Sequence, residues 1–156
     1  MADHVIESRL WLARPRPEVF AFLTDPRNLP RLVPSSLRVT FTQPPPPMEA
    51  GAIYDLRVSW SGLPLRWRCF VREHDPPYRF VSVQVRGPWA RWEQRHRFLE
   101  TDAGTWLEER LLYQPPLGPA GRLMHAVVLR RQVQTLWTYR LRRLAALLGP
   151  VSARAG

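Results

Sequence analysis

The residues best placed for chemistry lie on one predicted strand, Arg91–Phe98. Its odd-numbered positions are charged, whereas Trp92, Gln94, His96 and Phe98 are not. This alternation predicts that the four uncharged side chains face inward. Glutamine and histidine are unusual on an otherwise apolar face. His96 can be a hydrogen-bonded core residue, or it can anchor a ligand or transfer a proton near neutral pH.

Glu109 is a second candidate, on the segment Thr105–Tyr113. It shares one face of that predicted strand with apolar residues. If this face is the inward one, the carboxylate is buried and needs a partner. The candidate partners are His96 or Arg130.

Two polar residues interrupt the apolar arc of a predicted helix, Pro119–Leu148. Its helical periodicity runs for about thirty residues and ends at Gly149 and Pro150. Arg130 and Gln134 are the two exceptions. The arc itself consists of Leu123, Val127, Val133, Trp137, Leu141, Leu144 and Leu148. Arg130 can extend its aliphatic stem to solvent, or its guanidinium can bind a carboxylate, phenolate or enolate group of a ligand.

No metal site, cofactor or catalytic centre is predicted. Cys69 is the only cysteine, which excludes an internal disulfide and a multi-cysteine metal site. We interpret it as a buried, unreactive thiol rather than a nucleophile. No second metal ligand stands at a suitable spacing from His96, and no nucleophile with a base and an orienting group can be identified. We assign no role to His4, His74 and His125.

The elements that position these residues follow in the order strand, two short helices, six strands and the long helix. His4–Ala13 alternates as a first strand, and Glu18–Leu23 and Arg27–Leu32 are short helices bounded by prolines. The six further strands are Leu37–Phe41, Ala52–Trp60, Leu65–Glu73, Tyr78–Arg86, Ala90–Glu100 and Thr105–Tyr113. The later strands have short links, rich in turn-forming residues, which predict antiparallel neighbours.

The inward face is clear for one central strand and ambiguous for the next. In Leu65–Glu73 the alternation with arginines directs Trp67 inward. In Tyr78–Arg86 either set of alternate residues could face inward, and we favour the valines because they are the more hydrophobic. The two sets are Val81, Val83 and Val85 against Phe80, Ser82 and Gln84.

We expect an α+β fold in which a curved, seven-stranded antiparallel sheet is covered on its apolar face by the long helix. The two short helices would close one end and leave a cavity between the helix and the sheet. We predict a single domain over residues 1–156 with an ordered core over about 4–148. The predicted cavity lining is Trp67, Trp92, Gln94, His96, Phe98, Glu109, Val127, Arg130, Gln134 and Trp137.

Four segments of the sequence resemble the ligand-binding SRPBCC proteins of the START and Bet v 1-like superfamily. They are Asn28–Pro34 (NLPRLVP), Pro64–Val81 (PLRWRCFVREHDPPYRFV), Gln84–Phe98 (QVRGPWARWEQRHRF) and Pro116–Gln132 (PLGPAGRLMHAVVLRRQ). The resemblance extends from about Val5 to Leu148. It implies the helix-grip fold of this superfamily and a deep, mostly apolar cavity for a small hydrophobic molecule.

The basic composition admits two interpretations. All 23 basic residues are arginine, and the formal net charge is +10. Such a charge could serve a nucleic-acid or anionic-membrane surface. However, the arginines alternate along the predicted strands instead of forming a block, which favours a solvated outer face. We therefore expect no nucleic-acid partner. The arginines and the 17 prolines would also suit a protein that works at high temperature.

No address outside the cytoplasm is predicted. The N-terminal sequence lacks the apolar core of a signal peptide, and no run of about eighteen apolar residues predicts a membrane span. We expect a cytoplasmic protein, and its oligomeric state stays open.

Three functions are compatible with these features. The first is the binding or carriage of a small hydrophobic molecule, such as a lipid, an isoprenoid or a polyketide-like compound, without catalysis. The second is an enzyme of the polyketide cyclase, aromatase or dehydratase type, in which His96 with Arg130 or Glu109 moves a proton. The third, implied by the resemblance, is a protein-interaction module of the Hsp90-activator type.

Overall fold

The computed structural model describes residues 3–149 and contains one antiparallel sheet of seven strands in the order β1-β7-β6-β5-β4-β3-β2. The strands are β1 (His4–Leu12), β2 (Thr40–Phe41), β3 (Ile53–Trp60), β4 (Leu63–Asp75), β5 (Arg79–Arg86), β6 (Arg91–Glu100) and β7 (Thr105–Gln114). Consecutive strands from β2 to β7 are neighbours, and β1 pairs with β7 at one edge. The predicted seven-stranded antiparallel sheet is confirmed.

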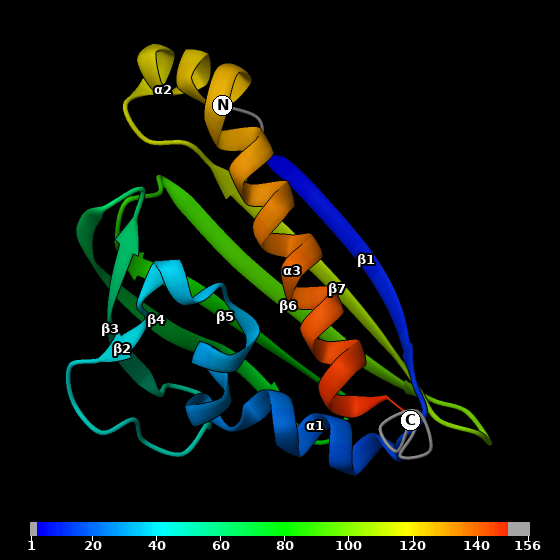
Figure 1. The fold of residues 1–156 in the computed structure, drawn as a ribbon. Coiled ribbons are helices and arrows are strands. Elements are labelled where there is room, and N and C mark those ends of the chain that lie inside the picture. Colours follow the sequence, from blue (N-terminus) through cyan, green and yellow to red (C-terminus); the bar gives the residue numbers. More distant parts are fainter. Residues whose placement is uncertain (1–2, 150–156) are drawn as a thin grey trace.

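The helices lie on one side of the sheet. They are α1 (Arg16–Thr24), the 3₁₀ turns η1 (Pro26–Leu32) and η2 (Ser35–Leu37), then α2 (Gly118–Met124), the π-helical turn η3 (His125–Leu129) and α3 (Arg130–Leu148). In Figure 1, α3 crosses the inner face of the sheet diagonally, and α1 lies at the far end of the molecule from α2. The expected α+β helix-grip architecture, with a long C-terminal helix over a curved sheet, is therefore confirmed.

The long helix extends over the predicted range, but its buried face differs from the predicted arc. The buried side is lined by Gly121, His125, Leu129, Val133, Trp137, Arg140, Leu144 and Leu148. Leu123 and Val127 are 69% and 71% exposed, so their predicted inward orientation is wrong. The reason is the π turn, which contains one residue more than an α turn. It rotates the preceding turns by about 100° relative to the turns that follow. Pro150, which we expected to end the helix, lies outside the described residues.

Gly121 allows the first turn of this helix to pack against the chain that leads into it. A Cβ atom at this position would lie 1.4 Å from the carbonyl oxygen of Pro116. Only glycine can occupy such a position without displacing the backbone. The start of the long helix is thus fixed by a local backbone contact.

The elements between β1 and β3 are less regular than expected. The predicted strand Leu37–Phe41 is extended and paired only at Thr40–Phe41, because the preceding 3₁₀ turn ends at Arg38 in the left-handed conformation (φ 46°). The predicted short helix at Arg27–Leu32 is a 3₁₀ turn with Pro30 inside it. Proline removes a backbone donor and disfavours a regular α-helix.

The predicted orientation of β5 is wrong. Phe80 pairs with His96 and Ser82 with Gln94 across the β5–β6 ladder, so both face inward. Phe80 belongs to the buried core beside α1, whereas Val85 is 54% exposed. Successive side chains of a strand point to opposite faces of the sheet, so the orientation of one residue sets the orientation of all the others in the strand. With Phe80 on the inner face, the three valines lie on the outer face, where Val81 is still buried at 5% exposure.

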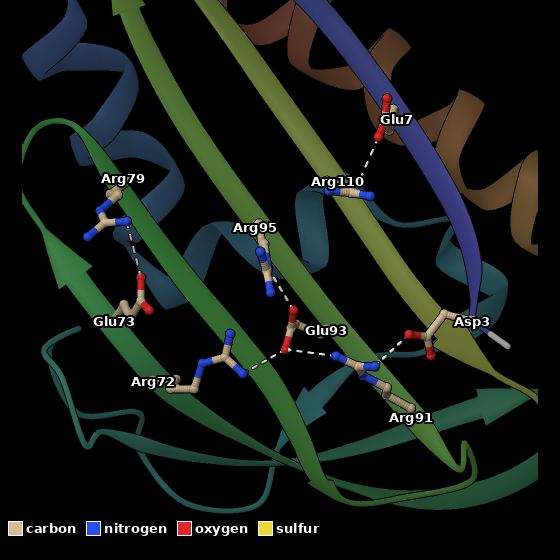
Figure 2. A network of polar contacts seen from close by, with 9 residues as sticks. All are labelled: Asp3, Glu7, Arg72, Glu73, Arg79, Arg91, Glu93, Arg95 and Arg110. Atoms are coloured by element: carbon tan, nitrogen blue, oxygen red, sulfur yellow. Dashed lines mark hydrogen bonds and ion pairs between the residues drawn. The ribbon is translucent and has the colours of Figure 1, made fainter. Parts of the chain in front are cut away.

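The outer face of the sheet carries the arginines in a network of ion pairs (Figure 2). At its centre Glu93 is only 2% exposed, and its carboxylate lies 2.7 Å from both Arg72 and Arg95. Arg91 completes the group and reaches Asp3. Burial tends to raise the pKa of Glu93, but hydrogen bonds and charges of Arg95 and Arg72 outweigh it and hold the pKa below its usual range. The prediction that these arginines face outward is confirmed.

Candidate functional site

A cavity lies between the inner face of the sheet, the loop that contains η1 and η2, and α3. It has two lobes of about 100 and 90 Å³. The lobes adjoin because they share lining residues, which are Leu29, Leu32, Leu56, Cys69, Gln94 and Arg140. The cavity that we expected between helix and sheet is therefore present.

The first lobe is walled mainly by aromatic and aliphatic side chains. Trp60 comes from β3, Trp67 from β4, Trp92 from β6 and Trp137 from α3. The rings of Trp67 and Trp92 meet edge to face with their centroids 5.3 Å apart, an arrangement favoured by their quadrupoles. The indole of Trp137 is tied to β1 by a hydrogen bond from Nε1 to the hydroxyl of Ser8, at 3.1 Å. The wall is thus rigid and apolar.

The second lobe brings polar groups to the cavity. It is lined by Phe80, Ser82, Gln94, His96 and Arg140, besides the residues of α1 and η1. The ring of Phe80 stacks on His96 with centroids 4.1 Å apart and planes inclined by 14°. This stacking fixes the plane of the imidazole against the sheet.

Behind this lobe, Glu109 joins His96 and Arg140 in a buried triad. Glu109 Oε2 lies 2.7 Å from His96 Nδ1 and 2.6 Å from Arg140 Nη2. The exposed fractions of the three side chains are 0% for Glu109, 2% for His96 and 8% for Arg140. Glu109 and His96 are directly opposite on β7 and β6, whereas Arg140 comes from α3. The triad therefore joins the helix to the sheet.

The charges in the triad follow from its geometry. Burial tends to raise the pKa of Glu109, but the charge of Arg140 and the hydrogen bonds from both partners outweigh it and lower that pKa to about 2. Burial lowers the pKa of His96, and the neighbouring Arg140 lowers it further, against the opposing effect of Glu109. At neutral pH the triad thus contains a carboxylate, a guanidinium and a neutral imidazole, and its net charge is zero.

The neutral imidazole has a defined tautomer. A carboxylate only accepts hydrogen bonds, so Nδ1 of His96 must carry the proton that it donates to Glu109. Nε2 is then the unprotonated nitrogen, and none of the described residues is a hydrogen-bond partner of it. His96 can accordingly accept a hydrogen bond or a proton from a molecule in the cavity.

The structure brings most of the predicted lining residues together. Trp67, Trp92, Gln94 and Trp137 line the first lobe, and His96 lines the second. Two further residues of that prediction support the cavity from behind. Phe98 is 1% exposed and lies in the core beside α1, and Glu109 is the centre of the triad.

Three residues of that prediction do not face this cavity. Val127 is on the exposed side of the helix, and Arg130 and Gln134 are also exposed. Arg130 and Gln134 line a separate surface hollow beside β1. Their expected position opposite Gln94 and His96 is therefore wrong, because the buried stripe of α3 is narrower than the predicted arc and passes through Val133, Trp137 and Arg140 instead.

Arg140 is the residue that the sequence argument missed. It takes the place that we assigned to Arg130 as the partner of Glu109. Its position could have been recognised, because it follows Trp137 by three residues and precedes Leu144 by four. This is the spacing of one helix face.

Cys69 lines both lobes but offers no nucleophile. Burial raises the pKa of its thiol to about 12. Among residues 3–149, no three His, Cys, Asp or Glu side chains are grouped in a way that could hold a metal ion. The polar side chains available in the cavity include those of Tyr54, Ser82, Gln94, His96 and Arg140.

Comparison with known proteins agrees with this architecture. The model of a family described as polyketide cyclase / dehydrase and lipid transport matches residues 12–137. The chain belongs to this family. The family match includes His96 and Glu109, and Arg140 lies just beyond its end. No curated protein sequence matches the chain significantly.

Solved structures share the fold of this family member. The protein TTHA0849 from Thermus thermophilus has a TM-score of 0.68 and 18% identity, over 92% of this chain and 99% of that chain. The Zhui aromatase/cyclase from Streptomyces sp. R1128 has a TM-score of 0.65 and 17% identity, over 93% of this chain and 96% of that chain. A START superfamily protein from Mycobacterium smegmatis has a TM-score of 0.70 and 13% identity, over 93% and 97%. These likenesses confirm the helix-grip fold that the resemblance to the START and Bet v 1-like superfamily implied.

Proposed function

We propose that this protein binds and carries a small, neutral, hydrophobic molecule that bears a hydroxyl or carbonyl group. One observation carries the proposal. A cavity with tryptophan walls ends at a buried polar group, the triad of His96, Glu109 and Arg140, whose charges cancel. Binding sites of this kind combine an apolar lining with few polar groups that orient the ligand.

The charge balance favours a neutral ligand over an anionic one. Arg140 is already neutralised by Glu109 at 2.6 Å. A ligand carboxylate would lose its hydration and would lie close to the carboxylate of Glu109 without a free cation to compensate. A hydroxyl group, in contrast, can donate a hydrogen bond to Nε2 of His96, and the amide of Gln94 can donate a hydrogen bond to a carbonyl group.

The volume restricts the size of the ligand. The two lobes of about 100 and 90 Å³ are small beside the roughly 300–1,000 Å³ of a typical drug-sized pocket. A compact ligand of one or two rings, or one aliphatic chain, suits this space. A long polyketide or a two-chain lipid would require the loop with η1 and η2 to move away from α3.

Calorimetric titration with three naphthalene derivatives tests the proposal. We expect 2-naphthol to bind more tightly than naphthalene, because only 2-naphthol can bond to His96, and more tightly than the anion 2-naphthoate. His96→Phe keeps a stacked ring but removes the nitrogen, and it should abolish the advantage of 2-naphthol over naphthalene. Tightest binding of 2-naphthoate would contradict a neutral ligand.

A second candidate is a proton-transfer enzyme of the cyclase, aromatase or dehydratase type. The observation in its favour is the pair His96 and Glu109, because Glu109 holds Nδ1 and leaves Nε2 as a base toward the cavity. This orientation of an imidazole by a carboxylate is typical of general-base catalysis. In such a reaction Nε2 would take a proton from the carbon next to a ligand ketone and return it to a carbon or oxygen atom.

Deuterium exchange distinguishes the two candidates. 2-Tetralone has an aromatic ring and a ketone with acidic α-hydrogens, and its exchange in D₂O can be followed by NMR. An enzyme should accelerate the exchange, and His96→Phe should remove the acceleration while 2-tetralone still binds. A carrier should bind 2-tetralone without acceleration.

A further inference from the structure

An exposed apolar surface covers the outer side of α2 and η3. We call it the helix tip, and its residues are Leu117, Leu123, Met124, Val127 and Val128, with exposed fractions of 71%, 69%, 44%, 71% and 43%. They come from consecutive turns opposite the buried Gly121, His125 and Leu129. Figure 1 places α2 at the end of the molecule opposite α1. An apolar surface of this extent on one helix is unusual for a face that contacts only water.

Arginines surround the helix tip. Arg122 lies within α2, and Arg130 and Arg131 follow η3 by less than one turn; all three are exposed. In the part of the chain that the structure describes, no carboxylate forms an ion pair with any of the three. The sequence contains no aspartate or glutamate after Glu109, so no acidic side chain follows along the same helix.

The sheet provides a contrast within the same molecule. Several arginines of its outer face are ion-paired with carboxylates, as Arg72, Arg91 and Arg95 are with Glu93 (Figure 2). Their charge is compensated inside the protein. The charge of the arginines at the helix tip is not compensated by an ion pair, so this end of the molecule attracts anions.

We propose that the helix tip docks on the surface of an anionic lipid bilayer. A helix with an exposed apolar side and arginines beside it is the combination that lies at a membrane interface, where apolar side chains enter the acyl boundary and cations contact anionic headgroups. Leu123 and Val127 would enter the bilayer, and Arg122, Arg130 and Arg131 would contact the headgroups. This is peripheral docking, since none of the described helices is long and apolar enough to cross a membrane.

The positive charge of the helix tip favours an anionic bilayer over a second copy of the chain as its binding partner. Two copies that met through their helix tips would bring six uncompensated arginines together, three from each, and like charges at an interface oppose association. A nucleic acid would satisfy the arginines but would leave the apolar side chains exposed. An anionic bilayer satisfies both.

Vesicle flotation tests the proposal with the full chain. We expect the protein to float with phosphatidylcholine vesicles that contain phosphatidylglycerol, and to float much less with phosphatidylcholine alone. Added salt should weaken the binding, because it screens the arginines. Arg130→Gln and Arg131→Gln should each lower the partition coefficient about fivefold, the effect expected for one arginine near an anionic surface.

Matched variants separate the apolar contribution from general effects of charge. Leu123→Asp with Val127→Asp should abolish flotation, and both positions are exposed enough to leave the fold intact, which a thermal melt can verify. The control is Val85→Asp, at an exposed position of β5 that is not part of the helix tip, and it should change flotation much less. The proposal is overturned if binding does not depend on phosphatidylglycerol, if Val85→Asp abolishes it equally, or if the double variant floats like the wild type. It is also overturned if light scattering shows a dimer that the double variant dissolves, or if the helix tip binds DNA and no vesicles.

Discussion

Arg140 Nη2 of α3 lies 2.6 Å from Glu109 Oε2 of β7, and both side chains are buried. The same carboxylate oxygen lies 2.7 Å from Nδ1 of His96. The carboxylate of Glu109 thus joins the long helix to the sheet, fixes the tautomer of His96 and balances the charge of Arg140 beside the cavity. The structural and the functional roles of the triad cannot be separated, and both can be tested by substitution.

Removal of both Arg140 and Glu109 should cost less free energy of unfolding than the sum of the two single removals. Arg140→Leu leaves a buried carboxylate without its cation, and we expect a loss of about 3–5 kcal/mol in the free energy of unfolding. Glu109→Gln should be destabilising for the same reason, because the guanidinium is then uncompensated. The double variant Arg140→Leu with Glu109→Gln should be clearly less destabilised than the sum of the two. Urea denaturation measures all three, and strict additivity would show that the two side chains are not coupled.

The stability of the protein should decrease in acid in two stages. Burial lowers the pKa of His96 below 6.5 in the folded state, so the unfolded state binds its proton first and stability decreases as the pH falls below about 6.5. The pKa of Glu109 falls from 4.5 to about 2 on folding. Its contribution, roughly 3 kcal/mol, is present above about pH 4.5 and is lost as the pH falls toward 2. Chemical denaturation at a series of pH values should show a smaller second stage in Glu109→Gln than in the wild type; a second stage of equal size would contradict the role of Glu109.

Cys69 should resist alkylation in the folded protein. Only the thiolate reacts, and burial raises the pKa of this thiol to about 12. Iodoacetamide at pH 8 should modify it slowly in buffer and rapidly in denaturant, as followed by mass spectrometry. A native rate equal to that of the denatured protein would contradict the buried position of the thiol in the cavity wall.

Gly121→Ala should destabilise the protein more than the neighbouring substitution Ala120→Gly does. The new Cβ would lie 1.4 Å from the carbonyl oxygen of Pro116, so the start of α2 must move. Ala120→Gly, at an exposed helical position, is the matched control and should cost only about 1 kcal/mol through helix propensity. Thermal melts of the two variants provide the comparison, and an unchanged melting temperature for Gly121→Ala would refute the tight contact.

The sheet could be predicted from the sequence, because its signals are local. Charge alternation in Arg91–Phe98 predicted the inward face of β6, and the apolar neighbours of Glu109 made its face of β7 the inward candidate, which the structure bears out. The short turns between the later strands set the antiparallel order. The inward orientation of His96 and Glu109 agrees with these signals. This shared orientation brings His96 Nδ1 to 2.7 Å from the carboxylate of Glu109.

The helix side of the site could not be predicted in the same way. Regular helical periodicity placed Arg130 and Gln134 within a broad inner arc, but the buried stripe of α3 is narrower and passes through Val133, Trp137 and Arg140. The π turn at His125–Leu129 changes the phase only of the residues before it, such as Leu123 and Val127. No residue type in that segment signals such a turn. The orientation of β5 was ambiguous for a different reason, since both of its faces carry apolar residues and the packing of Phe80 decides between them.

Native mass spectrometry of protein purified from its own host tests the central proposal most directly. We expect the wild type to retain a small molecule, visible as a discrete mass shift that disappears on unfolding. Val39→Phe fills the first lobe, which Val39 lines, and should abolish the mass shift. Val85→Phe adds the same group at an exposed site and should leave the shift unchanged. Equal retention by both variants, or no mass shift in the wild type, would contradict a ligand in this cavity.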